Sequence, residues 1–193
     1  MKFIIEHMEL EVYDWCLLEY KHMSKIVGKS NLIFTNVKKQ QSKLKNLGKV
    51  HKESIKELLN IYPKQEICLL DMDAKTTLTT KDKTNFKYFL FGGILGDNPR
   101  KHRTQTLKSK IKTKTRNLSQ RQMSTDTAVY VTHKILKGKK LEQLKFTDEL
   151  EIVLDENKGA TESVILPFRY VVEKNKVILP PGLIKYLKNK KSI

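Results

Sequence analysis

The fold of this chain is decided by the stretch Phe86-Lys87-Tyr88-Phe89-Leu90-Phe91-Gly92-Gly93-Ile94-Leu95-Gly96-Asp97. Its aromatic and apolar first half predicts a buried strand. Its three glycines can take positive φ and let the backbone approach a ligand closely. A strand that runs into such a loop is the usual place of a small-molecule site in an α/β fold. A Gly-Gly pair is also common in plain tight turns, so the loop alone does not define a site.

Composition predicts one domain with a proper core. The chain has 193 residues, of which 39% are hydrophobic. It contains no run of 18 apolar residues and no signal peptide, which predicts a soluble cytoplasmic protein without a membrane segment. Cys16 and Cys68 lie far apart and are expected to be buried, reduced thiols. The five histidines show no zinc spacing, so no metal is predicted.

The charge balance predicts a polyanionic partner. Lys and Arg number 38 against 21 acids, a net charge of +17, which favours RNA or a ribonucleoprotein. Only five of the 38 are Arg, so a merely lysine-rich surface is the alternative. Residues 98–125 contain nine basic side chains and no acid. Within them, residues 108–116 alternate with a period of two, which predicts a strand or extended arm with one cationic face. An edge strand guarded by lysines would look similar, but the length without an acid favours a partner-facing surface.

The order of the predicted elements indicates an α/β domain with a largely parallel sheet. The predicted strands of this part are residues 3–5, 31–35, 66–70 and 86–91, and the predicted helices are residues 9–27, 51–61 and 123–136. Residues 71–83 are expected to form a loop that can hold a helical turn at 74–79. Further along, the pattern predicts strands at 150–154 and 163–166, a hairpin over 169–179 that turns at 174–175, and a last helix at 183–188. No internal repeat and no second domain is indicated.

Several blocks along the chain are similar to one branch of the SPOUT methyltransferases. The blocks are Ile4-Ile5-Glu6-His7-Met8-Glu9, Trp15 with Leu18-Glu19-Tyr20, Phe91-Gly92-Gly93-Ile94-Leu95-Gly96-Asp97, Arg103-Thr104, Gln122-Met123-Ser124-Thr125-Asp126-Thr127-Ala128-Val129 and Leu166-Pro167-Phe168-Arg169-Tyr170. That branch includes a fungal enzyme that methylates an arginine of a small-subunit ribosomal protein, and archaeal relatives described as RNA methyltransferases. The resemblance spans nearly the whole chain, in order.

The resemblance implies a single SPOUT domain over residues 1–193, with a Rossmann-like, mostly parallel sheet and a C-terminal trefoil knot. The knot would occupy about 86–140, and a small strand and helix segment about 145–193. The implied cofactor is S-adenosyl-L-methionine (SAM). Its implied contacts are Phe91, Gly92, Gly93, Leu95, Gly96, Asp97, Asn117, Leu118, Gln122, Met123, Ser124, Thr125, Thr127 and Ala128. The chain departs from the family pattern at Ser119-Gln120, where Gly-Pro often follows the Asn-Leu pair.

Methyl transfer from a sulfonium requires alignment of donor and acceptor and a free lone pair on the acceptor. An arginine acceptor is protonated in water, so nearby carboxylates would orient it and take a proton. The catalytic candidates are Asp97, Glu6 and Glu9. Asp126 is a fourth carboxylate, although a helix N-terminus also explains it. The predicted substrate or partner contacts are Arg100, Arg103, Lys108, Lys110, Lys112, Lys114, Arg116 and Arg169.

The function expected from these features is SAM-dependent methylation of an arginine in a ribosomal protein. An RNA methyltransferase that acts on rRNA or tRNA is the alternative, and a catalytically silent RNA-binding protein is a third possibility. The sequence leaves the oligomeric state and the acceptor atom open, and the resemblance slightly favours a monomer over a dimer.

Overall fold

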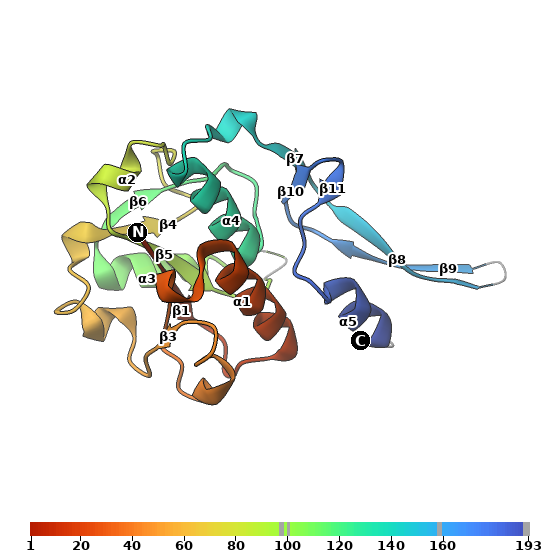
Figure 1. Cartoon of the computed structure of the whole chain (residues 1–193), viewed down its shortest axis with the longest axis horizontal. Helices are drawn as coiled ribbons and strands as arrows, with labels where there is room; N and C mark the ends of the chain where they lie inside the picture. Colours follow the sequence, from red (N-terminus) through yellow and green to blue (C-terminus); the bar gives the residue numbers. More distant parts are fainter. Residues whose placement is uncertain (97–98, 100, 158–159, 191–193) are drawn as a thin grey trace.

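A six-stranded sheet forms the centre of the molecule (Figure 1), in a computed structural model that describes residues 1–96, 99, 101–157 and 160–190. The strand order is β3-β2-β1-β5-β4-β6, and every neighbouring pair is parallel. The strands are β1 (Lys2–His7), β2 (Leu32–Thr35), β3 (Lys49–Val50), β4 (Ile67–Leu70), β5 (Tyr88–Gly93) and β6 (Lys114–Arg116). The glycine-rich loop therefore leaves β5 from inside the sheet.

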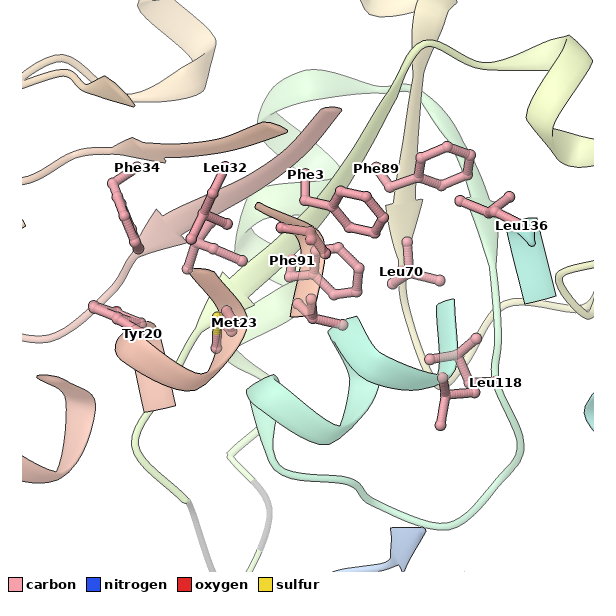
Figure 2. Packing of buried hydrophobic residues seen from close by; sticks show 14 of the residues in the cluster. Phe3, Tyr20, Met23, Leu32, Phe34, Leu70, Phe89, Phe91, Leu118 and Leu136 are labelled. Carbon is pink, nitrogen blue, oxygen red and sulfur yellow. The ribbon is translucent and has the colours of Figure 1, made fainter. Parts of the chain in front are cut away.

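Helices cover both faces of this sheet. Helices α1 (Asp14–Val27) and α4 (Thr125–Leu136) pack against each other on one face, and α3 (Arg103–Ile111) packs on the other. Successive strand residues point to opposite faces of the sheet. Phe3 therefore joins the first apolar core, under α1 and α4, and Ile4 joins the second, under α3. Figure 2 shows Phe3, Phe89 and Phe91 from neighbouring strands gathered in the first core. Both faces are thus apolar, as a parallel sheet requires.

Short helical segments connect these elements. They are α2 (Asp82–Asn85) and the 3-10 helices η1 (Lys29–Asn31), η2 (Gln41–Lys43), η3 (Ile55–Leu58), η4 (Lys64–Glu66) and η5 (Leu141–Gln143).

The C-terminal part forms a separate antiparallel unit against α1. Its elements are β7 (Lys145–Thr147), β8 (Leu150–Asn157), β9 (Ala160–Leu166), β10 (Tyr170–Glu173), β11 (Lys176–Val177) and α5 (Leu183–Asn189). Strands β8 and β9 pair as a hairpin that projects from the body (Figure 1). A third apolar cluster, which includes Trp15 of α1 and Leu183 of α5, joins this unit to the main domain.

Most of the predicted elements are confirmed. The four predicted strands of the parallel sheet, the C-terminal hairpins and the last helix are all present, with ends shifted by a few residues. Helices α1 and α4 begin later than predicted, at Asp14 and Thr125. Cys16 and Cys68 are free and buried, as predicted, and burial raises the pKa of each thiol to about 12.

The prediction of an extended arm over residues 108–116 is wrong. The chain forms α3 up to Ile111, and only β6 is extended. Leu107 and Ile111, four residues apart, are both buried against the sheet. This helical spacing of two apolar side chains outweighs the period-two alternation of exposed lysines, because burial and not charge fixes the local structure.

The predicted helix at 51–61 is also wrong, since only the single turn η3 forms there. Ser54 caps this turn in a capping box with Glu57, and Ile55 and Leu58 are its buried residues. The helical turn expected at 74–79 is absent from that described segment, and α2 follows it instead. The two short strands β3 and β7 have too few residues for a period-two pattern, and the sequence did not indicate them.

Candidate active site

A cavity of about 150 Å³ lies at the C-terminal ends of β4 and β5, several times the volume of a water molecule, about 30 Å³. This is the edge at which parallel α/β sheets bind ligands. The glycine-rich loop, the segment after β6 and the start of α4 form its walls, together with the start of α3 and one residue of the C-terminal unit. The lining residues are Leu70, Asp71, Met72, Phe91, Gly92, Ile94, Gly96, Lys101, His102, Arg103, Thr104, Leu118, Ser119, Arg121, Gln122, Met123, Ser124, Thr125, Ala128 and Phe168.

The glycines of the loop have different roles. A Cβ on Gly93 would lie 2.8 Å from the Tyr20 hydroxyl oxygen and 2.9 Å from Ile5 Cγ2, so close packing against α1 and β1 requires glycine there. Gly96 has φ +39° and faces the ring of Phe168, which lies 3.0 Å from the position of a Cβ. Gly93 therefore shapes the loop from behind, whereas Gly92 and Gly96 lie on the cavity wall.

The start of α4 is tied to the loop. The Thr125 hydroxyl donates to the carbonyl oxygens of Gly92, at 3.2 Å, and of Ile94, at 3.4 Å. The Ser124 hydroxyl donates to Asp126 Oδ1 at 2.7 Å. The backbone N–H of Arg169 donates to the carbonyl of Gln122 at 2.8 Å, which joins this wall to the C-terminal unit. Two walls of the cavity are thus held together by direct hydrogen bonds.

Asp126 is fully buried and holds α4 against α1. Its Oδ2 lies 2.8 Å from Nδ1 of His22. Glu19, one turn before His22 on α1, is also buried and accepts a hydrogen bond from Trp15 Nε1 at 3.1 Å. Burial, and next the charge of Asp126, hold the pKa of Glu19 well above its usual range. Asp126 is therefore a structural residue of the helix interface and not a carboxylate that faces the cavity.

Glu9 joins three segments at the cavity. Its Oε1 accepts hydrogen bonds from the backbone N–H of Leu95, at 2.9 Å, and from Arg103 Nη2, at 2.6 Å. Arg103 Nη1 also donates to the carbonyl oxygen of Met8 at 3.1 Å. Glu9 itself does not line the cavity, but Arg103 does. This geometry gives Glu9 a positioning role through the loop and α3.

The carboxylate of Glu6, which was predicted to be catalytic, is held by hydrogen bonds away from the cavity. Glu6 is buried and does not line the cavity. Its carboxylate accepts hydrogen bonds from the hydroxyls of Thr35 and Ser54 and from the backbone N–H of Ile55, at 3.0 Å. The Glu6 carboxylate would have to give up these three hydrogen bonds to contact a substrate arginine. In this structure it anchors the segment before η3.

Four of the predicted partner-binding cations are engaged in ion pairs inside the protein. Arg103 pairs with Glu9, Lys108 with Asp71, Arg116 with Asp82 and Arg169 with Asp148, at N–O distances of 2.6, 3.0, 3.0 and 2.8 Å. Lys110, Lys112 and Lys114 are exposed. Arg100 lies outside the described residues. Of the nine basic residues in 98–125, Arg103, Lys108 and Arg116 thus pair with carboxylates of the protein itself.

Nine of the fourteen predicted cofactor contacts line the cavity, namely Phe91, Gly92, Gly96, Leu118, Gln122, Met123, Ser124, Thr125 and Ala128. Gly93, Leu95, Asn117 and Thr127 do not line it. The Asn117 side chain instead donates to the carbonyl of Ala74 at 2.8 Å, and Thr127 accepts from Ser124. Asp97 lies outside the described residues.

The sequence interpretation missed several lining residues. Asp71 follows β4 directly, and a carboxylate directly after a buried strand was the available signal. Phe168 belongs to a block that carried the resemblance, but only its neighbour Arg169 was named as a contact. His102 and Arg121 had no signal beyond their charge.

In the described part of the chain, no three His, Cys, Asp or Glu side chains come together in a group that could hold a metal ion. None of its helices is both long and apolar enough to cross a membrane.

Comparison with solved structures defines the class of protein. The structure of yeast SFM1 complexed with SAM matches with a TM-score of 0.88 and 36% identity, over 97% of this chain and 90% of that one. Trm10 from Thermococcus kodakaraensis matches with a TM-score of 0.60 and 18% identity, over 74% and 95% of the two chains. The second likeness shows the fold alone. The fold is that of a SPOUT methyltransferase.

Sequence comparison then gives the family. The chain is 38% identical to the protein arginine N-methyltransferase SFM1 of Saccharomyces cerevisiae over an alignment of 206 residues. The match covers 97% of this chain and 94% of that protein. The family described as SFM1-like protein arginine N-methyltransferases matches residues 2–192. The chain belongs to this SFM1-like family.

Proposed function

We propose that this protein transfers the methyl group of SAM to an arginine side chain of a ribosomal protein in the cytoplasm. One observation carries the proposal. The loops that line the cavity belong to a chain that aligns over nearly its whole length with an arginine methyltransferase whose structure is solved in complex with SAM.

The cavity walls fit the cofactor in their chemistry. Gly92 and Gly96 offer backbone that a ligand can approach closely. Leu118, Met123 and Ala128, from the segment after β6 and from α4, offer apolar surface suited to the adenine ring. SAM supplies the electrophilic methyl group when bound. The protein contributes alignment, because an in-line displacement needs donor and acceptor held in register.

The acceptor guanidinium must lose a proton as the new bond forms. Asp97 remains our candidate for the carboxylate that orients the guanidinium and takes this proton. Glu9 would be a positioning residue, because its carboxylate holds the glycine-rich loop through the N–H of Leu95 and holds Arg103 at the cavity. Of the described lining residues, Asp71 carries a carboxylate. Its side chain is fully buried, and it forms an ion pair with Lys108.

The distribution of charge supports a basic protein substrate. Residues 148–166, which include the β8–β9 hairpin, contain six acids and one lysine, whereas the rest of the chain contains 15 acids and 37 basic residues. Glu149, Glu151 and Glu162 are exposed there. Ribosomal proteins are rich in Lys and Arg, and complementary charge would guide such a segment toward the hairpin, whose strand β9 ends two residues before Phe168 of the cavity wall.

We also propose, from the resemblance, that residues 1–193 form a single domain with a trefoil knot over about 86–140. From the same resemblance, a monomer is our proposed oligomeric state.

Labelling decides between protein and RNA as acceptor. Purified protein is incubated with radiolabelled SAM and small ribosomal subunits, and the product is then digested with nuclease or with protease. Label that survives nuclease and is lost to protease is expected. Label lost to nuclease alone would instead establish an RNA methyltransferase. The variant Ala128→Phe, which fills the cavity, should abolish the label while circular dichroism shows an intact fold.

A further inference from the structure

A dense group of lysines lies at the β3 edge of the sheet, outside the active site. Residues 38–56 carry seven lysines and one acid, Glu53. All seven side chains belong to exposed residues, and none makes an ion pair in the described part of the chain. These β3-edge lysines are Lys38, Lys39, Lys43, Lys45, Lys49, Lys52 and Lys56.

The β3-edge lysines stand on a well-packed surface. Val37, Leu44 and Ile55, which alternate with them along the chain, are completely buried. The backbone N–H of Val37 donates to the carbonyl of His51 at 3.1 Å, and His51 in turn donates to Phe34 of β2 at 2.8 Å. The segment, drawn in orange at the lower edge of Figure 1, is therefore a fixed platform and not a loose tail.

The platform differs from the basic stretch that the sequence first indicated. At 103–116, internal carboxylates already neutralise Arg103, Lys108 and Arg116. The β3-edge lysines have no such partners, so their mutual repulsion is relieved only by solvent ions or by an external polyanion. Edge protection explains a few lysines beside β3, but not seven that extend from residue 38 to η3.

We infer that the β3-edge lysines bind the phosphate backbone of RNA without sequence preference. Lysines are point-charge phosphate binders, and their neutralisation of phosphates releases counterions. No exposed large hydrophobic residue lies within the described segment 38–56, so base stacking and insertion into a membrane surface both lack an anchor. The identification of the polyanion as RNA rests on the proposed ribosomal substrate. The RNA-binding surface itself is a second site, separate from the one that transfers the methyl group.

The position of the platform leaves the active site open. Strand β3 is separated from β5, which carries the glycine-rich loop, by β2 and β1. RNA on the platform and a protein segment at the cavity would therefore occupy different parts of the molecule. Ribosomal RNA would hold the enzyme on a particle while the acceptor arginine enters the cavity.

The test measures RNA binding directly. The protein is titrated onto a fluorescent RNA hairpin of arbitrary sequence, and anisotropy is followed over a range of salt concentrations. The test variant carries Lys→Gln at 38, 39, 45, 49 and 52. The control variant carries the same five-charge loss at exposed lysines elsewhere, at 137, 139, 176, 185 and 188.

We expect the test variant to bind RNA at least tenfold more weakly, and to show a flatter salt dependence, by about 0.9 in slope for each lost phosphate contact. The control should bind within about threefold of the wild type, the bulk effect of lower net charge. Equal affinities of the two variants, or binding of the wild type to phosphatidylserine vesicles and not to RNA, would overturn the inference.

Methylation of a free peptide separates this inference from the proposed function. Both variants should methylate a short arginine peptide at the wild-type rate, because neither set of lysines lines the cavity. Absence of methylation by the wild type would refute the proposed function while leaving the RNA measurement intact. With ribosomal subunits as substrate, KM should rise in the test variant alone.

Discussion

Glu9 Oε1 lies 2.6 Å from Nη2 of Arg103, and this contact joins the end of β1 to the first turn of α3 beside the cavity. The same oxygen accepts from the N–H of Leu95, so one carboxylate fixes the glycine-rich loop and α3 together. Both groups are only partly exposed, with side-chain exposures of 16% and 26%. Shielding from water strengthens such an ion pair compared with one on the surface.

The first prediction concerns Glu9. In Glu9→Gln the charge-assisted bonds to Leu95 and Arg103 are weakened, and hydrogen bonds to charged groups contribute about 1.5–3 kcal/mol. SAM affinity should therefore fall by about tenfold or more, as measured by isothermal titration calorimetry. The control is Glu11→Gln, whose carboxylate accepts a hydrogen bond from the exposed Gln40 side chain. Wild-type affinity in the Glu9 variant would show that the loop does not need this anchor.

The second prediction concerns Glu6. In Glu6→Gln the amide N–H₂ replaces one carboxylate oxygen, so it faces either the Ser54 hydroxyl or the Thr35 hydroxyl and the Ile55 N–H, and all three hydrogen bonds lose the carboxylate charge. Such a mismatch costs about 1–3 kcal/mol. Urea denaturation should show this loss of stability, whereas the specific activity of the folded enzyme should stay near that of the wild type. A loss of kcat with unchanged stability would return Glu6 to the list of catalytic candidates.

The contrast between Glu6 and Glu9 shows where prediction from sequence stops. The sequence placed Glu6 at the end of the first strand, which is right, and Glu9 at the start of a helix that in fact begins at Asp14. Which face each side chain takes depends on the register of β1 and on residues such as Ser54 that come from far along the chain. Phe168 is a similar case, since it reaches the cavity from the C-terminal unit. Local patterns carry no information on such distant partners.

The parallel sheet was predictable for the opposite reason. Strands β1, β2, β4 and β5 are buried on both faces and are therefore nearly continuous apolar runs, visible in the sequence without any partner. Helix α3 was missed because its two buried residues, Leu107 and Ile111, are few among many lysines. When only a few buried residues fix the structure of a segment, the spacing of its many exposed residues dominates the sequence and hides the spacing of the buried ones.

The third prediction compares two neighbouring glycines. In Gly93→Ala the new Cβ would lie within 3.0 Å of Tyr20, Ile5 and the Glu6 carbonyl, so we expect a stability loss of about 1–3 kcal/mol. In Gly92→Ala the nearest atoms are the flexible ends of Ile94 and Met8, at 3.2 and 3.3 Å, so the loss should be smaller. Thermal unfolding of both variants gives the comparison. Equal losses would contradict the packing role assigned to Gly93.

The fourth prediction concerns the acidic hairpin. Replacing the exposed Glu149 and Glu162 with Lys reverses charge where a basic substrate would approach. KM for a lysine- and arginine-rich peptide should rise several-fold at low salt, and the difference should shrink as salt screens the charges. Glu142→Lys, an exposed change in η5, is the control. An unchanged KM at low salt would remove the hairpin from substrate binding.

The last prediction is a pH dependence that comes from Glu19. Its folded-state pKa is raised by burial and by Asp126, so the folded protein holds a proton that the unfolded chain releases above about 4.5. Stability from this group is fully present below that pKa, and it is lost as pH rises through the folded-state value. Glu19→Gln keeps an oxygen that can accept from Trp15 but carries no charge at any pH.

The variant should therefore unfold at a higher temperature than the wild type in alkaline buffer, and at nearly the same temperature in acid. Calorimetry across the pH range measures this difference. Glu142→Gln, at an exposed position, should follow the wild type throughout. A Glu19→Gln variant that is less stable at alkaline pH would mean that the ionised carboxylate is the stabilising form, paired with His22 or another group across the α1–α4 interface.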